Sequence, residues 1–125
     1  STVIHVHPVP KNKPVSYLGH YQTRKDTNIA VIGSGYADGI PSSLSNKGHV
    51  LINGQLFPIV GLVCMDMTLV DLGKNEVNCK KGDKVTFIGT QETQSISLED
   101  MATTCGKNPR EVLCGMGQRT ERVYL

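Results

Sequence analysis

His49-Val-Leu-Ile-Asn-Gly-Gln-Leu-Phe-Pro-Ile-Val60 is the stretch that decides the fold of this chain. Two apolar runs, 49–52 and 56–60, flank the dipeptide Asn53-Gly54. Asparagine and glycine tolerate the positive φ angles of the two-residue turns that join antiparallel strands. The stretch therefore predicts a β-hairpin with a secure register.

Short apolar runs separated by turn residues continue on both sides of this hairpin, a pattern typical of strands. Glu111 to Cys114 is expected to form a short helical turn or a strand, and Val15-Ser16-Tyr17 follows a proline-containing loop. The other expected strands are Val3 to Val9, Asn28 to Ile32, Thr68 to Leu72, Lys84 to Ile88 and Thr120 to Leu125.

One helix is expected after Ser97, whose hydroxyl can accept from the backbone of Asp100 in a variant of the capping box. Gly106 is suited to end this helix because glycine takes the left-handed conformation without strain. The apolar side of the helix would be Leu98, Met101 and Ala102. Together with the strands, this predicts a mainly β fold: an antiparallel, barrel-like domain with one short helix.

Length and charge narrow the class of protein. The chain has 125 residues, enough for a single domain, 1–125, with one core. Its formal net charge is +2, its basic residues are scattered, and aromatic residues make up 5% of it. Such a surface offers neither a continuous basic track nor a stacking platform, so we expect no nucleic-acid partner. No apolar run is long enough to cross a bilayer, so we expect no membrane partner.

The cysteines and histidines predict no metal site. The spacings of the four cysteines match none of the usual zinc patterns. Cys64 and Cys114 lie in apolar stretches, where a free thiol is usually buried. His5 and His7 would share one face of a strand, but two ligands do not make a metal site. We therefore expect no metal, reduced thiols and a cytoplasmic protein.

Three segments carry residues suited to chemistry. Tyr17 follows a loop, although a lone tyrosine is more often packed, with its hydroxyl bonded to the backbone. Gly33-Ser-Gly-Tyr-Ala-Asp-Gly39 has enough glycine to approach a ligand closely. Its case as a phosphate loop is weak, because only a short helix could follow it. Asp66 lies in an apolar stretch, where a carboxylate must be paired or hydrogen-bonded, and a structural and a functional role are equally favoured.

In sequence order, these segments resemble the C-terminal domain of alanine racemases. The matching motifs are Val15-Ser16-Tyr17, Gly35-Tyr36-Ala37-Asp38-Gly39, Ile59-Val60-Gly61 with Val63-Cys64-Met65-Asp66, Gly82-Asp83-Lys84-Val85 and Glu111-Val112-Leu113-Cys114. Their combination covers essentially the whole chain. The resemblance implies a β-rich, barrel-like module of a larger enzyme, whose (β/α)8 barrel lies outside this chain and holds pyridoxal phosphate on a lysine.

The resemblance also implies a reaction and its residues. Such enzymes are isomerases that interconvert L- and D-alanine, and D-alanine serves the peptidoglycan of the cell wall. They are homodimers in which this domain contacts the barrel of its own chain and faces the cofactor of the partner subunit. Tyr17 would be the catalytic base opposite the lysine. The Met65 amide would bind the substrate carboxylate with Asp66 beside it, and Tyr36 would narrow the opening to the site.

Three positions depart from the family pattern. Many members carry arginine where this chain has Ser42 and Leu62, so the usual charges at the opening are in doubt. Many members have a phosphate-binding tyrosine at the position of Arg110. Because arginine can bind phosphate bidentately, we assign Arg110 to the cofactor phosphate. Pairing of Arg110 with Glu99 or Glu111 on the surface is the alternative.

Tyr17 would need neighbouring charges to act as a base. A phenol titrates near pH ~10, so proton abstraction near neutrality requires a shift of about three units, or roughly 4 kcal/mol. Cations can supply that shift, and in the family they come from the barrel. In this domain alone we therefore expect an ordinary phenol and no racemase activity.

Two other functions are kept as alternatives. One is a racemase of broader range, acting on serine or lysine, which the missing arginines leave open. The other is a free-standing β module that binds a partner. Strand-like patterns at both ends lead us to expect a piece of a longer protein instead. The surface that packs on the barrel would then form an apolar patch around Tyr17, Tyr36 and Met65.

Overall fold

The computed structural model describes residues 1–16, 19–117 and 119–124. Most of the regular structure in this part is strand: β1 (Val3–Val9), β2 (Pro14–Val15), β3 (Tyr21–Gln22), β4 (Thr27–Ile32), β5 (His49–Ile52), β6 (Gln55–Pro58), β7 (Thr68–Gly73), β8 (Val85–Thr86), β9 (Gly89–Gln91) and β10 (Gln94–Ile96). The helices are the 3-10 turns η2 (Tyr36–Asp38) and η3 (Ser42–Leu44), and the α-helices α1 (Leu98–Cys105) and α2 (Pro109–Cys114). The predicted mainly β class is confirmed.

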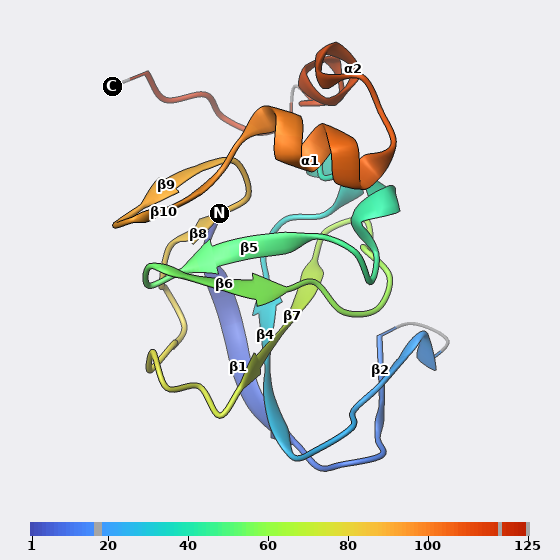
Figure 1. Ribbon diagram of the computed structural model, residues 1–125, viewed down its shortest axis with the longest axis vertical. Coiled ribbons are helices and arrows are strands. Elements are labelled where there is room, and N and C mark those ends of the chain that lie inside the picture. The colour runs from blue at the N-terminus through green and yellow to red at the C-terminus, as the bar shows by residue number, and fades with distance from the viewer. Residues whose placement is uncertain (17–18, 118, 125) are drawn as a thin grey trace.

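Two antiparallel sheets form the body of the domain (Figure 1). One has the order β1-β4-β7 and the other the order β6-β5-β8. Isolated bridges join their edges, Thr2 to Lys84 on one side and Ile59 to Val70 on the other. In the described part of the chain, no continuous ladder runs along these edges, so the antiparallel fold is barrel-like without a closed barrel.

The β5–β6 hairpin has the predicted turn. Ile52 pairs with Gln55, and between them Asn53 and Gly54 have φ angles of 49° and 79°. Both angles are positive, as a tight hairpin turn requires. The Asn53 amide also donates to the Asp83 carboxylate at 3.1 Å, which ties the turn to the segment before β8. The predicted hairpin is confirmed.

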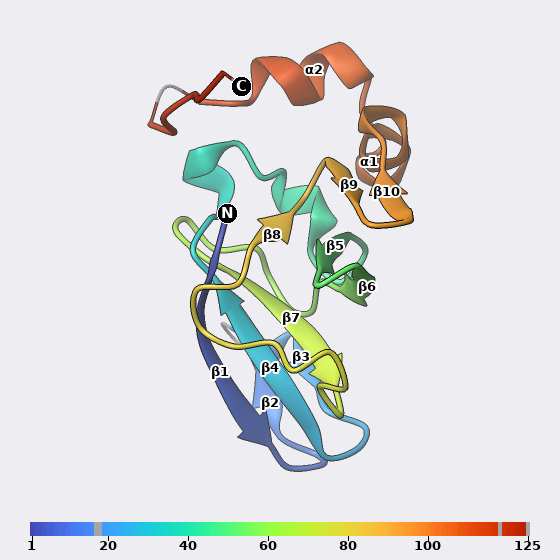
Figure 2. The ribbon, with the colours of Figure 1, turned by 90° about the vertical axis from the view of Figure 1, so that its left-hand side faces the viewer.

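The hydrophobic core lies between the sheets and continues under the helices. Ala30 and Ile32 of β4 and Val50 of β5 have no solvent exposure. Met101 of α1 and Val112 of α2 belong to the same buried cluster. Burial of each large apolar side chain contributes about 1.5–3 kcal/mol. The two helices therefore cover one end of the β-structure, as Figure 2 shows.

Helix α1 begins and ends as predicted. The Ser97 hydroxyl accepts the Asp100 amide at 2.9 Å, and the Asp100 carboxylate accepts the Ser97 amide at 3.0 Å. Gly106 follows the helix with a φ of 68°. The capping box and the glycine stop are both confirmed.

The structure has a second α-helix besides the one expected, α2 (Pro109–Cys114), so of the two alternatives kept for Glu111 to Cys114 the helical turn is confirmed and the strand is wrong. Asn108 caps α2 by accepting the Arg110 amide at 2.9 Å, and proline fits the first helical position because it has no N–H to leave unbonded. The segment is so short that its apolar pattern fits a helical turn and a strand equally well. No helix in the described ranges has both the length and the hydropathy to span a membrane.

The expected strand Thr120 to Leu125 is wrong over its described part. Residues 120–124 belong to no strand, and Val123 and Tyr124 are 73% and 86% exposed. A strand needs a partner edge, which an apolar pattern alone cannot reveal. Leu125 lies outside the described residues.

Two smaller expectations also differ from the structure. The β9–β10 hairpin was not predicted, because its residues are mostly polar and carry no alternating apolar pattern. Cys64 and Cys114, both expected to be buried, are half-buried and exposed respectively, whereas Cys79 is buried. Burial raises the pKa of the Cys79 thiol to about 11, so it is inert at neutral pH.

Candidate functional site

The residues predicted to bind a substrate gather around the site loop, residues 61–67, which connects β6 to β7. The amides of Tyr36 and Ala37 donate to the carbonyl oxygens of Cys64 and Met65 at 2.9 and 3.0 Å. These two hydrogen bonds join η2 to the site loop side by side. The sequence placed Tyr36 and Met65 in separate motifs, and the structure brings them together.

Gly35 allows this close approach. A side chain at this position would put its Cβ 2.1 Å from the Cys64 carbonyl oxygen, closer than any real contact. The Gly35 amide donates to the Asp38 carboxylate at 2.9 Å, which closes the turn that carries Tyr36. The glycine-rich segment therefore serves a close approach of backbone to backbone.

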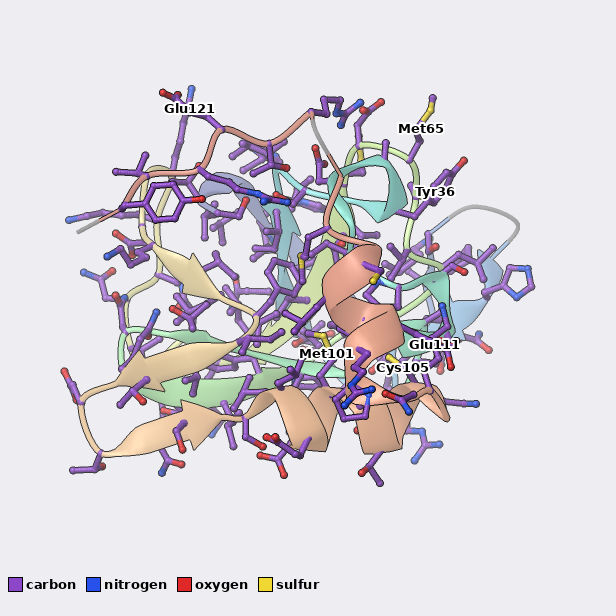
Figure 3. All side chains as sticks on the ribbon, turned by 90° about the horizontal axis from the view of Figure 1, so that it is seen from above. Tyr36, Met65, Met101, Cys105, Glu111 and Glu121 are labelled. Atoms are coloured by element: carbon purple, nitrogen blue, oxygen red, sulfur yellow. The ribbon has the colours of Figure 1, made fainter. Side chains whose placement is uncertain are left out.

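Tyr36 and Met65 project outward from neighbouring loops, as Figure 3 shows. They are 53% and 51% exposed, and Met67 at the end of the site loop is 41% exposed. Large apolar side chains are rarely so exposed together on a monomer unless something covers them. Of the patch expected around Tyr17, Tyr36 and Met65, the latter two residues are exposed on adjoining segments, and Tyr17 lies outside the described residues.

The backbone C=O of Met65 is hydrogen-bonded, whereas its N–H forms no hydrogen bond within the described residues. Its carbonyl oxygen accepts from Ala37, but no acceptor for its N–H lies among the described residues. Met65 as a residue is 51% exposed, so the tip of the site loop that carries this N–H lies at the surface. A backbone amide in this state can donate to an anion without adding a formal charge to the site.

Arg119 joins the two halves of the site. Its guanidinium donates to both carboxylate oxygens of Asp38, at 2.9 and 3.0 Å. A third contact reaches the Asp66 carboxylate on the site loop at 2.7 Å. The Arg119 guanidinium, and after it the Gly35 amide, lowers the pKa of Asp38 below its ordinary value. The Asp66 carboxylate, which the sequence analysis expected to be paired or hydrogen-bonded, therefore forms an ion pair with Arg119.

The segment on both sides of Tyr17 is tied to the site loop. The Ser16 hydroxyl accepts the Leu62 amide at 2.8 Å. Asn46 accepts the Gly61 amide at 2.6 Å and donates to the His20 carbonyl oxygen at 3.1 Å. Tyr17 itself lies outside the described residues.

Arg110 lies apart from this cluster, on α2. A groove lined by Tyr36, Ser42, Lys107 and Glu111 separates η2 from that helix, and Arg110 is not among its lining residues. The Arg110 side chain is exposed. Neither Glu99 nor Glu111 forms an ion pair with it in the described residues, so the alternative of a surface pair is not observed.

Three residues of the site were not predicted as parts of it: Ser16, Asp38 and Arg119. Asp38 stood inside a motif that was noticed, but its role as the acceptor for both Gly35 and Arg119 depends on a partner 81 residues away. Arg119 lies in a polar segment with no motif of its own. Only a repeated pattern of charge pairing across relatives could have marked it.

Comparisons with known proteins agree with this geometry. A family model described as "Alanine racemase, C-terminal domain" matches residues 1–124. An alanine racemase of Cutibacterium acnes is 41% identical over 125 residues, covering 100% of this chain and 33% of the relative. "Alanine racemase 2" of Caldanaerobacter subterraneus subsp. tengcongensis is 38% identical over 123 residues, covering 98% of this chain and 31% of the relative.

Solved structures give the same result. The alanine racemase of Bartonella henselae, with covalently bound pyridoxal phosphate, has a TM-score of 0.92 and 36% identity, and the match covers 100% of this chain and 34% of that one. The enzyme of Streptomyces lavendulae has a TM-score of 0.93 and 35% identity, covering 100% and 32%. This chain thus spans about a third of the length of the relatives it matches. It belongs to the family of alanine racemase C-terminal domains.

Proposed function

We propose that this chain, as an alanine racemase C-terminal domain, completes the active site of an isomerase that interconverts L- and D-alanine by two-base proton transfer. The D-alanine would serve peptidoglycan synthesis for the cell wall. One observation carries the proposal: the site loop, which contains Met65 and Asp66, is hydrogen-bonded both to the turn of Tyr36 and to Ser16, the residue before Tyr17.

The Met65 amide binds the substrate carboxylate in this proposal. The N–H lacks an acceptor among the described residues, and its neighbouring carbonyls are held by η2, so the loop needs no rearrangement to present it. Asp66 is neutralised by Arg119 and therefore repels the carboxylate less than a lone aspartate would.

Tyr17 supplies the base on one face of the substrate. Its phenolate oxygen takes the Cα proton of L-alanine while a lysine of the barrel serves the opposite face. Two bases on opposite faces explain inversion, because one base returning the proton to its own face would restore the starting centre. Ser16 supports this role, since its hydrogen bond to Leu62 anchors the segment that leads into Tyr17.

The cofactor is pyridoxal phosphate, held by the barrel. When bound, it withdraws electrons from Cα and so makes the Cα proton acidic enough to transfer. Arg110 fits its phosphate chemically, because the guanidinium is exposed and pairs with no carboxylate in the described ranges. Bidentate hydrogen bonds from arginine are well suited to such a group.

The partners are the barrel of the same chain and that of a second subunit in a homodimer. The exposed apolar side chains of Tyr36, Met65 and Met67 support this, because such a patch is what an uncovered interface presents. We further propose a cytoplasmic location. Cys64, Cys79, Cys105 and Cys114 are all free, as is usual in a reducing compartment.

A second candidate substrate is serine. Ser42 is exposed and lines the same groove as Tyr36, at a position where many members of the family carry arginine. The smaller side chain leaves more room at the opening. Comparing kcat/KM for L-serine with that for L-alanine separates the two substrates.

The experiment that tests the proposed function is racemisation of L-alanine by the full-length protein, wild type against Tyr17→Phe. Loss of a general base lowers the rate by about 10²–10⁴-fold. We expect a loss of this size while pyridoxal phosphate, followed by its absorbance, stays bound. A wild type that forms no D-alanine, or a variant as fast as the wild type, would contradict the proposal.

A further inference from the structure

We infer that Arg119 is a positioning residue, which clamps the turn of Tyr36 to the site loop and so fixes the Met65 amide for the substrate carboxylate. The inference deepens the proposed function and rests on it. It assigns a task to an ion-pair network, Asp38–Arg119–Asp66, that the proton transfer itself does not use.

The geometry of the network favours a clamp over a simple surface pair. Arg119 uses two donors on Asp38, a bidentate arrangement, and a third contact on Asp66. The side chain of Asp38 is only 15% exposed, and the Gly35 amide also donates to it. An isolated exposed pair would contribute little, but a bidentate pair inside a network is the exception.

The carboxylates of Asp38 and Asp66 lie on the two segments, η2 and the site loop, whose relative position the clamp would fix. Asp38 ends η2, which carries Tyr36, and Asp66 follows Met65 directly on the site loop. Among the described residues, two backbone hydrogen bonds, those of the Tyr36 and Ala37 amides, join the two segments. Arg119 adds a third connection from the solvent side. Without it, the loop tip at Met65 and Asp66 is held from one side only.

Arg119 also sets the charge beside the bound anion. Asp66 is adjacent to the amide that receives the carboxylate, and its side chain is 57% exposed. Unpaired, it would repel the substrate carboxylate. Paired, it turns toward Arg119. The clamp thereby acts on substrate binding in two ways: it fixes the position of the Met65 amide and it neutralises the charge of Asp66. Neither effect acts on the proton-transfer step.

The test is the KM for L-alanine of the full-length protein in four variants: Arg119→Ala, Arg119→Lys, Asp66→Asn and the double variant Asp66→Asn with Arg119→Ala. We expect Arg119→Ala to raise KM about tenfold with a smaller change in kcat, since a hydrogen bond to a charged group is at stake. Arg119→Lys keeps the positive charge but loses the bidentate hydrogen bonds to Asp38, so its KM should lie between those of the wild type and Arg119→Ala. Asp66→Asn removes the repulsion, and in that background Arg119→Ala should cost less than it does alone.

Two further readouts separate positioning from general loss of structure. Inhibition by propionate, which is alanine without its amino group, should weaken in parallel with KM. Hydrogen exchange at the Tyr36 and Ala37 amides should speed up in Arg119→Ala, while the unfolding midpoint changes little. The matched control is Arg122→Ala, on the same segment, whose guanidinium donates to the Met116 carbonyl oxygen and forms no ion pair in the described residues. It should leave KM and exchange unchanged.

The outcomes are distinct. If the wild type racemises alanine but Arg119→Ala leaves KM, propionate inhibition and amide exchange as they were, the clamp is refuted and the proposed function stands. If the variants lose only kcat, Arg119 acts on the chemistry and the inference is equally refuted. If the wild type forms no D-alanine, the proposed function is wrong, and this role for Arg119 falls with it.

Discussion

The β5–β6 hairpin and the site loop are built by opposite means. The hairpin pairs neighbours in sequence across Asn53-Gly54, and its inward side chains are fully buried. The site loop is held by residues from distant segments: Ser16 bonds it across 46 positions, and Arg119 belongs to a network that reaches Asp38 across 81.

This difference assigns the two regions different roles: the hairpin stabilises the fold, and the site loop serves the function. The two strands of the hairpin pair with each other along 49–52 and 55–58, and the hairpin contributes most through burial of its apolar side chains. Within the described residues, the site region leaves the Met65 amide without an acceptor and large apolar side chains exposed. A segment that breaks the rules of a stable fold in this way is where a functional site is expected.

The largest expected effect comes from the core side of the comparison. Ile52 is fully buried, and truncation to alanine should lower the free energy of unfolding by about 2–5 kcal/mol. Met65→Ala, at an exposed position, should change it by less than about 0.5 kcal/mol. Urea unfolding of both variants measures the contrast. If Ile52→Ala does not fold, Ile52→Val should still cost about 0.5–1.5 kcal/mol. Equal losses in the two regions would break the comparison.

The same contrast explains what could be predicted from the sequence. Asn53-Gly54, the Ser97–Asp100 capping box and the Gly106 stop are local chemistry, and each is confirmed. The site motifs could be named from a family resemblance, but their meeting at the site loop could not be derived from spacing. Arg119 was missed because its meaning lies in Asp38 and Asp66, which the fold alone brings to it.

Gly35→Ala should have the next largest effect. The added Cβ would lie 2.1 Å from the Cys64 carbonyl oxygen, so η2 and the site loop must separate, at a cost of about 1–3 kcal/mol. Amide exchange at Tyr36 should accelerate as well. Gly33→Ala is the control, because the atom nearest to its added Cβ is a side-chain methyl group, Ile4 Cγ2, at 3.1 Å and not a backbone atom at 2.1 Å. A variant as stable as Gly33→Ala would mean that the two segments are not held at this distance.

Ser97→Ala tests a structure built by neighbours in sequence, the capping box of α1, and should have a smaller effect on stability. Loss of this cap should reduce stability by about 1 kcal/mol, as N-cap deletions generally do. It should leave the KM for alanine of the full-length protein unchanged, because α1 carries no site residue. Thr103→Ala, at an exposed position of the same helix, is the reference for a change without a cap. A change in KM would show that stability and function are less separate than the comparison holds.

The smallest effect concerns pH. The pKa of Asp38 is lowered by Arg119 and by the Gly35 amide, so its contribution to stability is present above the unfolded value of about 3.9 and is lost as the pH falls through the lower folded value. Asp38→Asn should therefore be less stable than the wild type near neutrality, and the gap should narrow in acid. Unfolding midpoints measured across this range check the trend. If the difference in stability between Asp38→Asn and the wild type does not change with pH, the charge of Asp38 does not contribute to stability through its ion pair with Arg119.

The most direct test of the site removes one N–H. Replacing Met65 by its α-hydroxy acid analogue in the full-length protein turns the amide into an ester and keeps the side chain. Since the amide is held to bind the substrate carboxylate, the KM for L-alanine should rise about tenfold. The ester also makes the Cys64 carbonyl oxygen a weaker acceptor for the Tyr36 amide, so a small fall in the unfolding midpoint is expected as well. The same replacement at Met67 should leave KM as it is. An unchanged KM for the Met65 ester would contradict the central claim that the site loop receives the substrate.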